Sequence, residues 1–305
     1  MKKFKLLALV CIAMLCVTLC LSLSACGSKD AGITDDGLVW RKREDGVHIT
    51  GYSGITENLV IPASIQNTPV VAISYYTFQN NAMLKTITIP DSVTSIGDWA
   101  FIDCDGLTSV TLGNSVTTIG GSAFEHCYNL TSIVIPDSVT SIGDFAFEEC
   151  FNLTSVTIGN SVTTIGDWAF YDCDGLTSIV IPDSVTSIGV GAFDHCDGLT
   201  SITIGNSVTS IGEAAFFYCS NLASVTIGNS VTSIGKAAFC GCDGLTTIVI
   251  PDSVSNIGES AFEGCYYLKN VYYTGTAEEW AQLSIGSYNS DLTRATIHYN
   301  YIPEE

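Results

Sequence analysis

The chain has 305 residues, of which 47% are hydrophobic and only 14% are charged. This composition excludes a disordered chain and fits either ordinary domains or one elongated repeat array. The formal net charge is −20, and no Lys or Arg occurs between Thr86 and Gly235, a span with 16 Asp and Glu. Such a surface repels phosphates, so we expect binding to neither nucleic acid nor anionic lipid headgroups.

The N-terminus has the features of an export signal. Three lysines within the first five residues precede an apolar stretch that ends in the sequence LSAC, residues 23–26. This segment resembles the lipobox of bacterial lipoproteins, which implies a signal peptide over 1–25 and a lipid on Cys26. An uncleaved membrane anchor is the alternative, because the apolar stretch nears the length that spans a bilayer. The lipid would hold the protein outside the cytoplasm, anchored to the bacterial cell envelope. Residues 26–36 would be a flexible linker.

From residue 61 onward the chain is a tandem repeat. The sequence IPDSV at residues 89–93 recurs in related form from residues 112, 135, 158, 181, 204, 227 and 250, always 23 residues apart. A ninth, longer unit begins at Ile61. We number the positions of each unit from 1 to 23, beginning at Ile89 in the first regular unit. Because this period fits neither one helix nor one strand, each unit is predicted to be one coil of a solenoid.

Local signals divide each coil into strand and turn segments. Position 19 to position 1 of the next unit is rich in Ser, Thr and Val with alternating apolar residues, which predicts a strand in a parallel sheet. Positions 5 to 8 predict a second short extended piece. Positions 10 to 16 are expected to form one or two helical turns, ended by a left-handed Gly or Asn at position 18. Gly at position 9 indicates a positive φ or a close approach between coils.

The string I-P-x-S-V-T-x-I-G-x-x-A-F-x-x-C-x-x-L-x-x-I resembles the BspA-type leucine-rich repeat of bacterial surface proteins, from Ile61 to about Tyr273. The resemblance implies a right-handed α/β solenoid with a parallel β-sheet on one face and short helical turns on the other. It also implies an extracellular role, commonly in adhesion or protein binding, with neither a catalytic motif nor a cofactor.

Both ends of the array are expected to carry caps, over 37–60 and 273–305, around a solenoid of about nine units over 61–272. In the first cap, residues 47–50 read as a short strand. In the second, Thr276 and Glu279 have the spacing of a capping box, which predicts a helix from Thr276 to Leu283. Residues 295–299 alternate as a final strand.

Cysteine occupies position 16 in all eight regular units. We predict a ladder of small, buried, reduced thiols, and Asn81, at the same position of the longer unit, is expected to hydrogen-bond a turn. Metal binding is the alternative, with Cys240 and Cys242 as the only close pair. The ladder consists of Cys104, Cys127, Cys150, Cys173, Cys196, Cys219, Cys242 and Cys265.

Positions 10, 11, 14, 15 and 17 point outward and vary strongly between units. Exposed aromatic residues there are candidate ligand-binding residues, and packing over the turns of adjacent coils is the alternative. The candidates are Trp99, Tyr128, Phe145, Phe151, Trp168, Tyr171, Phe217 and Tyr218. The strand face instead offers outward Ser, Thr and Val at positions 21 and 23, which suit hydrogen bonding to a peptide or glycan or simply favour strands.

Other chemistry finds little support in the sequence. Asp-x-Asp pairs occur at 103–105 and 172–174, but no loop has the full spacing of a calcium site, so we expect a solvated acidic flank without metal. His126 and His195 share position 15 but lie three coils apart, about 14 Å at sheet spacing, so the two side chains cannot bind one metal ion. No catalytic motif is present, so we expect a monomer that is not an enzyme. The predicted function is a cell-surface lipoprotein that binds a protein or glycan, and the alternative is a structural spacer of the envelope.

Overall fold

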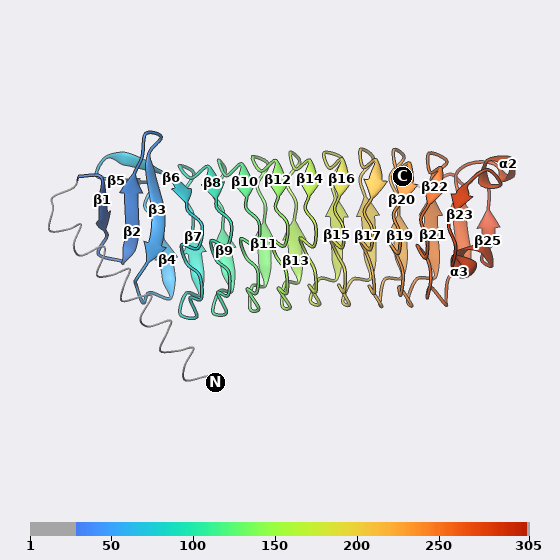
Figure 1. Cartoon of the computed structure of the whole chain (residues 1–305), viewed down its shortest axis with the longest axis horizontal. Coiled ribbons are helices and arrows are strands. Elements are labelled where there is room, and N and C mark those ends of the chain that lie inside the picture. The colour runs from blue at the N-terminus through green and yellow to red at the C-terminus, as the bar shows by residue number, and fades with distance from the viewer. Residues whose placement is uncertain (1–28, 304–305) are drawn as a thin grey trace.

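The structure is a computed structural model that describes residues 29–303. The chain forms an elongated rod of stacked coils, with the N-terminal strands at one end and two short helices at the other (Figure 1). The predicted signal peptide over 1–25 and the predicted lipid site at Cys26 lie outside the described residues. Adjacent coils place equivalent residues in register, as in the pairing of Ile119 with Ile142, 23 residues later.

One sheet runs the whole length of the rod and contains the second extended piece of each coil. Its strands in spatial order are β1 (Ala31–Ile33), β2 (Leu38–Lys42), β3 (Val47–Tyr52), β6 (Thr68–Ile73), β8 (Ser95–Ile96), β10 (Thr118–Ile119), β12 (Ser141–Ile142), β14 (Thr164–Ile165), β16 (Ser187–Ile188), β18 (Ser210–Ile211), β20 (Ser233–Ile234), β22 (Asn256–Ile257) and β24 (Ser284–Ile285), with β5 (Ser64–Ile65) paired to β6. From β3 to β24 the strands along this path are parallel, and the first three form an antiparallel cap.

The strand predicted from position 19 to position 1 of the next unit is present but shorter, beginning at position 21, and its ladder is divided into two parallel sheets. The first contains β4 (Asn58–Val60), β7 (Thr86–Thr88), β9 (Ser109–Thr111), β11 (Ser132–Val134) and β13 (Ser155–Thr157). The second contains β15 (Ser178–Ile181), β17 (Ser201–Ile204), β19 (Ser224–Thr226), β21 (Thr247–Ile250), β23 (Asn270–Tyr273) and β25 (Thr296–His298). Each coil therefore has strands on two sides, and the turns of positions 10 to 17 close the coil.

Side chains from the same coil position stack along the interior. Phe78 and the eight Phe residues of position 13 are fully buried, and neighbouring rings are parallel with centroids 4.9 to 5.4 Å apart. The predicted cysteine ladder is confirmed, since all eight thiols are buried and free. Each donates a hydrogen bond to the carbonyl of a Phe in the preceding coil, as Cys127 does to Phe101 at 3.3 Å. Burial raises the pKa of Cys104 to about 12, so this thiol stays protonated.

Glycine at position 9 is explained by close approach between coils. A Cβ on Gly143 would lie 2.6 Å from the carbonyl carbon of Gly120, and neither residue has a positive φ. The expected left-handed residue at position 18 is wrong. Asn129 instead donates from its side chain to the carbonyl of Asp105 in the preceding coil, and a Cβ on Gly106 would lie 2.2 Å from the Ala82 carbonyl oxygen. Position 18 is therefore chosen by contact between coils.

The C-terminal cap provides acceptors for backbone N–H groups of the last coil. In the middle of the rod, the carbonyls of the next coil accept these hydrogen bonds. Helix α2 (Ala277–Trp280) begins at the predicted capping box of Thr276 and Glu279 but ends before Leu283. A second helix, α3 (Ser290–Thr293), is buried at Asp291. The side-chain oxygens of Asn289 and Asp291 accept from the backbone N–H groups of Phe262 and Gly264. These side-chain oxygens take the place of the backbone carbonyls of a further coil, so these backbone N–H groups of the last coil have hydrogen-bond acceptors.

The remaining expectations for the ends are met in part. The strand predicted at 47–50 is present as β3, and the final strand predicted within 295–299 is present as β25. Within the segment 26–36, which the sequence suggested as a linker, β1 pairs with β2.

Asn81 lies in the longer first unit, at the position that Cys occupies in the regular units. It accepts hydrogen bonds from the backbone of Met83 and Leu84, so it closes a turn as expected.

Candidate binding surface on the turn edge

The turn edge, defined as positions 10 to 17 of every coil, forms no α-helix in any of the nine coils. This differs from the expected helical turns. Positions 11 and 15 are left-handed throughout, with φ of 55° at Trp99 and 56° at Asp103, and a left-handed residue cannot continue an α-helix. The N–H groups of Trp99, Phe101 and Asp103 donate to carbonyls of the next coil instead of within their own. The edge is therefore held by contacts between coils.

This backbone decides which side chains face outward. Positions 12, 13 and 16 bury Ala, Phe and Cys, while most residues at positions 10, 11, 14, 15 and 17 are exposed or half-buried; Ser122, Asp194 and three Gly residues at positions 11 and 15 are buried. No β-branched residue occupies position 11 or 15 in any regular unit, although Thr, Val and Ile are abundant elsewhere. That avoidance is the sequence signal for the left-handed turns, because β-branched residues are strongly disfavoured there.

The aromatic candidates are brought together in pairs along the edge. Trp99 stacks on Tyr76 of the preceding coil at 5.0 Å, and Phe145 stacks on Trp168 at 5.2 Å. Tyr128 stacks on Phe151 at 5.3 Å. Each pair joins equivalent positions of adjacent coils, so one side of a ring is covered by its neighbour. The aromatic residues thus pack against adjacent coils, as the alternative prediction stated. Trp99 is nevertheless 37% exposed, so packing and exposure occur together.

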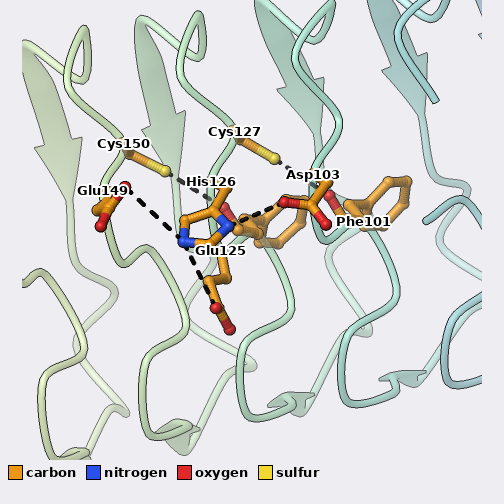
Figure 2. A network of polar contacts seen from close by, with 8 residues as sticks. Phe101, Asp103, Glu125, His126, Cys127, Glu149 and Cys150 are labelled. Atoms are coloured by element: carbon orange, nitrogen blue, oxygen red, sulfur yellow. Dashed lines mark hydrogen bonds and ion pairs between the residues drawn. The ribbon is translucent and has the colours of Figure 1, made fainter. Parts of the chain in front are cut away.

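His126 lies at the centre of the first polar cluster on the edge, which Figure 2 shows. Its Nδ1 is 2.8 Å from Oδ1 of Asp103, one coil back. Its Nε2 is 3.6 Å from Glu125 and 3.7 Å from Glu149, one coil forward. The imidazole also stacks on Tyr128. Three carboxylates from three coils therefore surround one histidine.

The charges of this cluster shift its pKa values. Burial alone would lower the pKa of His126, but the hydrogen bond to Asp103 and the charges of Glu125 and Glu149 outweigh it, so the pKa is raised. Burial, followed by the nearby charge of Glu125, raises the pKa of Glu148. Protonated His126 therefore acts as an internal cation that offsets its acidic neighbours.

His195 occupies the same position 15 three coils later and forms a second cluster with a different composition. Its Nδ1 is 2.6 Å from Oδ1 of Asp194, the residue before it. Its ring stacks on Tyr218 at 5.4 Å and meets Tyr171 and Phe217 edge-on. Phe217 and Tyr218 also contact each other edge to face. Three aromatic residues thus surround this histidine, and Tyr218 is 48% exposed.

The carboxylates beside the second cluster lack cationic partners. Within residues 29–303, Asp172, Asp174 and Asp197 take part in none of the ion pairs. Burial raises the pKa of Asp172 and of Asp174, neighbouring carboxylates add to both shifts, and the charge of His195 opposes both only in part. This side of the edge therefore carries negative charge that His195 offsets only partly.

Other kinds of site receive no support from the geometry. Across the described residues, no group of three or more His, Cys, Asp and Glu side chains is arranged to hold a metal ion. None of the helices in the same part of the chain has the length and apolarity needed to cross a bilayer. The features that remain are exposed rings and unpaired acids, which suit recognition of a ligand.

A family model described as the BspA type leucine rich repeat region matches residues 71–200 and 186–302, in six copies. These residues make up more than half of the chain. The chain belongs to the BspA-type leucine-rich repeat family. The resemblance drawn from the repeat is thereby confirmed, and so is the solenoid fold. Comparison with curated proteins finds no match.

Solved structures similar to this BspA-type protein include two bacterial proteins named as leucine rich and one pneumococcal antigen. A leucine rich cell surface protein of Faecalibacterium prausnitzii A2-165 shares 27% identity over 85% of this chain and 99% of its own, with a TM-score of 0.39. The T. pallidum leucine rich repeat protein shares 26% identity over 78% and 87%, with a TM-score of 0.44. The pneumococcal vaccine antigen PcpA shares 16% identity over 89% and 87%, with a TM-score of 0.52, which supports the fold alone.

Sequence reasoning named most rings of this BspA-type edge but missed their partners. Tyr76 was overlooked because it lies in the longer first unit, exactly one period before Trp99. From the sequence, His126 and His195 are assessed only as partners of each other, three coils apart. Most of the residues that contact these two histidines lie in adjacent coils. The two clusters become visible only when the coils are stacked and position 15 is seen beside positions 14 and 17. Cys26 remains a prediction.

Proposed function

We propose that this BspA-type protein is a surface-displayed scaffold that binds a protein or glycan ligand through its turn edge. The observation that carries the proposal is that large rings lie exposed, as Trp99 and Tyr218 do, or half-buried at positions whose identity is free to vary. Position 11 alone holds Trp, Phe, Ser, Ala and Gly in different coils, so the fold does not require an aromatic residue there. Exposed aromatic side chains are frequent anchors of binding interfaces.

The strand face is a weaker candidate for the same role. Its outward residues at positions 21 and 23 are small or β-branched, as in the exposed Ser109 and Thr111 of β9. These residue types are also those that strands favour without any ligand. Arg and aromatic anchors, which dominate binding energy at interfaces, are absent from the outward positions of β7 to β21.

Single substitutions on the two faces test this assignment. Ligands captured by cross-linking on intact cells would be purified, and their affinities compared for the wild-type, Trp99→Ala and Trp168→Ala proteins. Loss of a central anchor costs about 2 kcal/mol, or roughly thirty-fold in Kd. Val180→Ala is the matched control, because Val180 is an apolar residue of the strand face that is 66% exposed. Binding lost in the Val180 variant and kept in both Trp variants would assign the ligand to the strand face.

Attachment to the envelope through Cys26 is part of the same proposal. It is supported by the lysines, apolar stretch and LSAC sequence of the N-terminus. Cells would be labelled with radioactive palmitate and fractionated. The wild-type protein is expected in the membrane fraction with label, and Cys26→Ser without label and released. Label that persists in the Cys26 variant would contradict this site.

A structural spacer of the envelope is the second candidate, and the stacked pairs of rings favour it. Each pair adds contact between adjacent coils, which would strengthen the rod without any ligand. A spacer predicts that replacing the varied residues of positions 10, 11, 14, 15 and 17 together leaves the cellular phenotype intact. A binding scaffold predicts that the same replacement abolishes it while the protein stays folded.

A further inference from the structure

The geometry points to a recognition site for a cationic side chain in the cluster around His195, so we infer that the partner presents a Lys- or Arg-containing peptide segment. This inference rests on the proposed function, because it names the chemistry of a ligand bound at the turn edge. The site spans the fourth to sixth regular coils. It combines the rings of Tyr171, Phe217 and Tyr218 with the carboxylates of Asp172 and Asp174.

The rings are arranged for contact with a cation. Phe217 and Tyr218 meet edge to face with centroids 4.5 Å apart, so their two faces point in different directions. Tyr218 stacks on His195 through one face and is 48% exposed. A Lys or Arg side chain within about 6 Å of such a face is attracted by the negative charge of the ring face, and more strongly as water is removed.

Comparison with the His126 cluster explains why the second cluster is the open one. In the first, the single histidine lies within 3.7 Å of three carboxylates and supplies the positive charge itself. In the second, the ion pair described for His195 is with Asp194, the residue before it. Asp172, Asp174 and Asp197 form no ion pair among the described residues. An arriving cation would therefore meet carboxylates that feel the charge of His195 but form no ion pair with it.

Charge complementarity selects the occupant over other ligands. No Lys or Arg lies between Lys85 and Lys236, so the cluster sits within a long, uniformly acidic surface. Such a surface raises the local concentration of basic segments and repels acidic glycans, nucleic acids and anionic lipids. A basic segment of a protein partner is the ligand whose cationic side chains can contact the ring faces and form ion pairs with the carboxylates.

Fluorescein-labelled deca-lysine and its fully acetylated counterpart are suitable probes, with binding to the purified full-length protein followed by fluorescence anisotropy. Measurements at about 0.15 M salt suppress long-range attraction and favour close contacts. Deca-lysine is expected to bind at least tenfold more tightly than the acetylated peptide. Equal binding of the two peptides would overturn the inference.

Matched variants locate the site. Tyr218→Ala, and separately the Asp172→Asn and Asp174→Asn pair, are expected to weaken deca-lysine binding by about tenfold. The controls at the His126 cluster are Tyr128→Ala and the Asp103→Asn and Glu149→Gln pair, which are expected to change it less than twofold because these carboxylates already face His126. The Asn variants keep the shape of the edge, so they remain informative if Tyr218→Ala fails to fold. Equal losses at both clusters, or none at either, would contradict a site at His195.

The outcome separates this inference from the function on which it rests. If the acetylated peptide binds equally well while Trp168→Ala still weakens the captured ligand, the cationic partner is wrong and the turn edge remains the binding surface. If neither Trp168→Ala nor Tyr218→Ala affects any ligand, both proposals fail.

Discussion

Phe145 and Phe147 lie two residues apart in one coil, yet they belong to different regions of the molecule. Phe147 points into the interior and stacks between Phe124 and Phe170. Phe145 is half-buried on the turn edge and stacks on Trp168 alone. Position 13 is Phe in every regular unit, whereas position 11 holds Trp, Ser, Phe, Gly or Ala. The interior therefore fixes the fold, and the edge is free to differ from coil to coil.

The same backbone produces this difference. Left-handed residues at positions 11 and 15 turn the chain so that positions 12, 13 and 16 face inward while their neighbours face solvent. N–H groups from three positions of the edge donate to the next coil, so the edge keeps its shape whatever its side chains are. A repeat can therefore change its surface without loss of register, provided that β-branched residues are avoided at positions 11 and 15.

The largest effect is expected from removing one interior ring. Phe147→Ala leaves a cavity between two stacked rings and should lower the free energy of unfolding by about 3 to 5 kcal/mol. Chemical denaturation monitored by circular dichroism measures the change. Phe145→Ala is the control, because Ala214 and Ala237 already occupy its position in other coils. It should cost less than about 1.5 kcal/mol. A similar loss of unfolding free energy in the two variants would contradict the distinction between interior and edge.

A smaller effect is expected where two coils approach most closely. A Cβ on Gly120 would lie 2.6 Å from the backbone nitrogen of Asp98, whereas a Cβ on the adjacent Gly121 would lie no closer than 3.4 Å to any atom. Gly120→Ala should therefore destabilise the protein by about 1 to 3 kcal/mol through overpacking. Gly121→Ala should be close to neutral. Thermal unfolding of both variants gives the comparison, and a neutral Gly120→Ala would show that the coils are less tightly packed.

Much of this fold follows from the sequence because a 23-residue period leaves few alternatives. The register, the strands, the Phe and Cys ladders and the capping box at Thr276 all depend on spacing that can be counted along the chain. The spacing of Ala, Phe and Cys at positions 12, 13 and 16 is compatible with one face of a helix. The structure places the same side chains inward through left-handed turns instead, and hydrophobic spacing does not distinguish the two.

Features that depend on contacts between coils were the hardest to predict. Asn289 and Asp291 satisfy the last coil with side-chain oxygens, and no motif in the sequence marks them. The interruption between β13 and β15 is likewise absent from the repeat pattern, since both strands have ordinary sequences. Asp103, His126 and Glu149 come from three successive units, so their contact appears only after the coils are stacked.

The smallest effect concerns the charge of His126. Because its pKa is raised on folding, protonated His126 stabilises the folded state at pH values below the ordinary histidine pKa. This contribution is lost as the pH rises through the raised pKa. Titration by NMR should place His126 above the ordinary value of about 6.5, and Asp103→Asn should lower its pKa. A value at or below the ordinary one in the wild-type protein would show that burial outweighs the three carboxylates.

Hydroxyl-radical footprinting read by mass spectrometry tests most directly whether the interior holds the rod while the edge is left for contacts. In the native protein, Trp99 and Tyr218 should be oxidised rapidly, and the position 13 Phe and position 16 Cys series should stay protected until the chain unfolds. Oxidation of the interior Phe residues at the rate of Trp99 under native conditions would contradict the stacked solenoid and everything inferred from its edge.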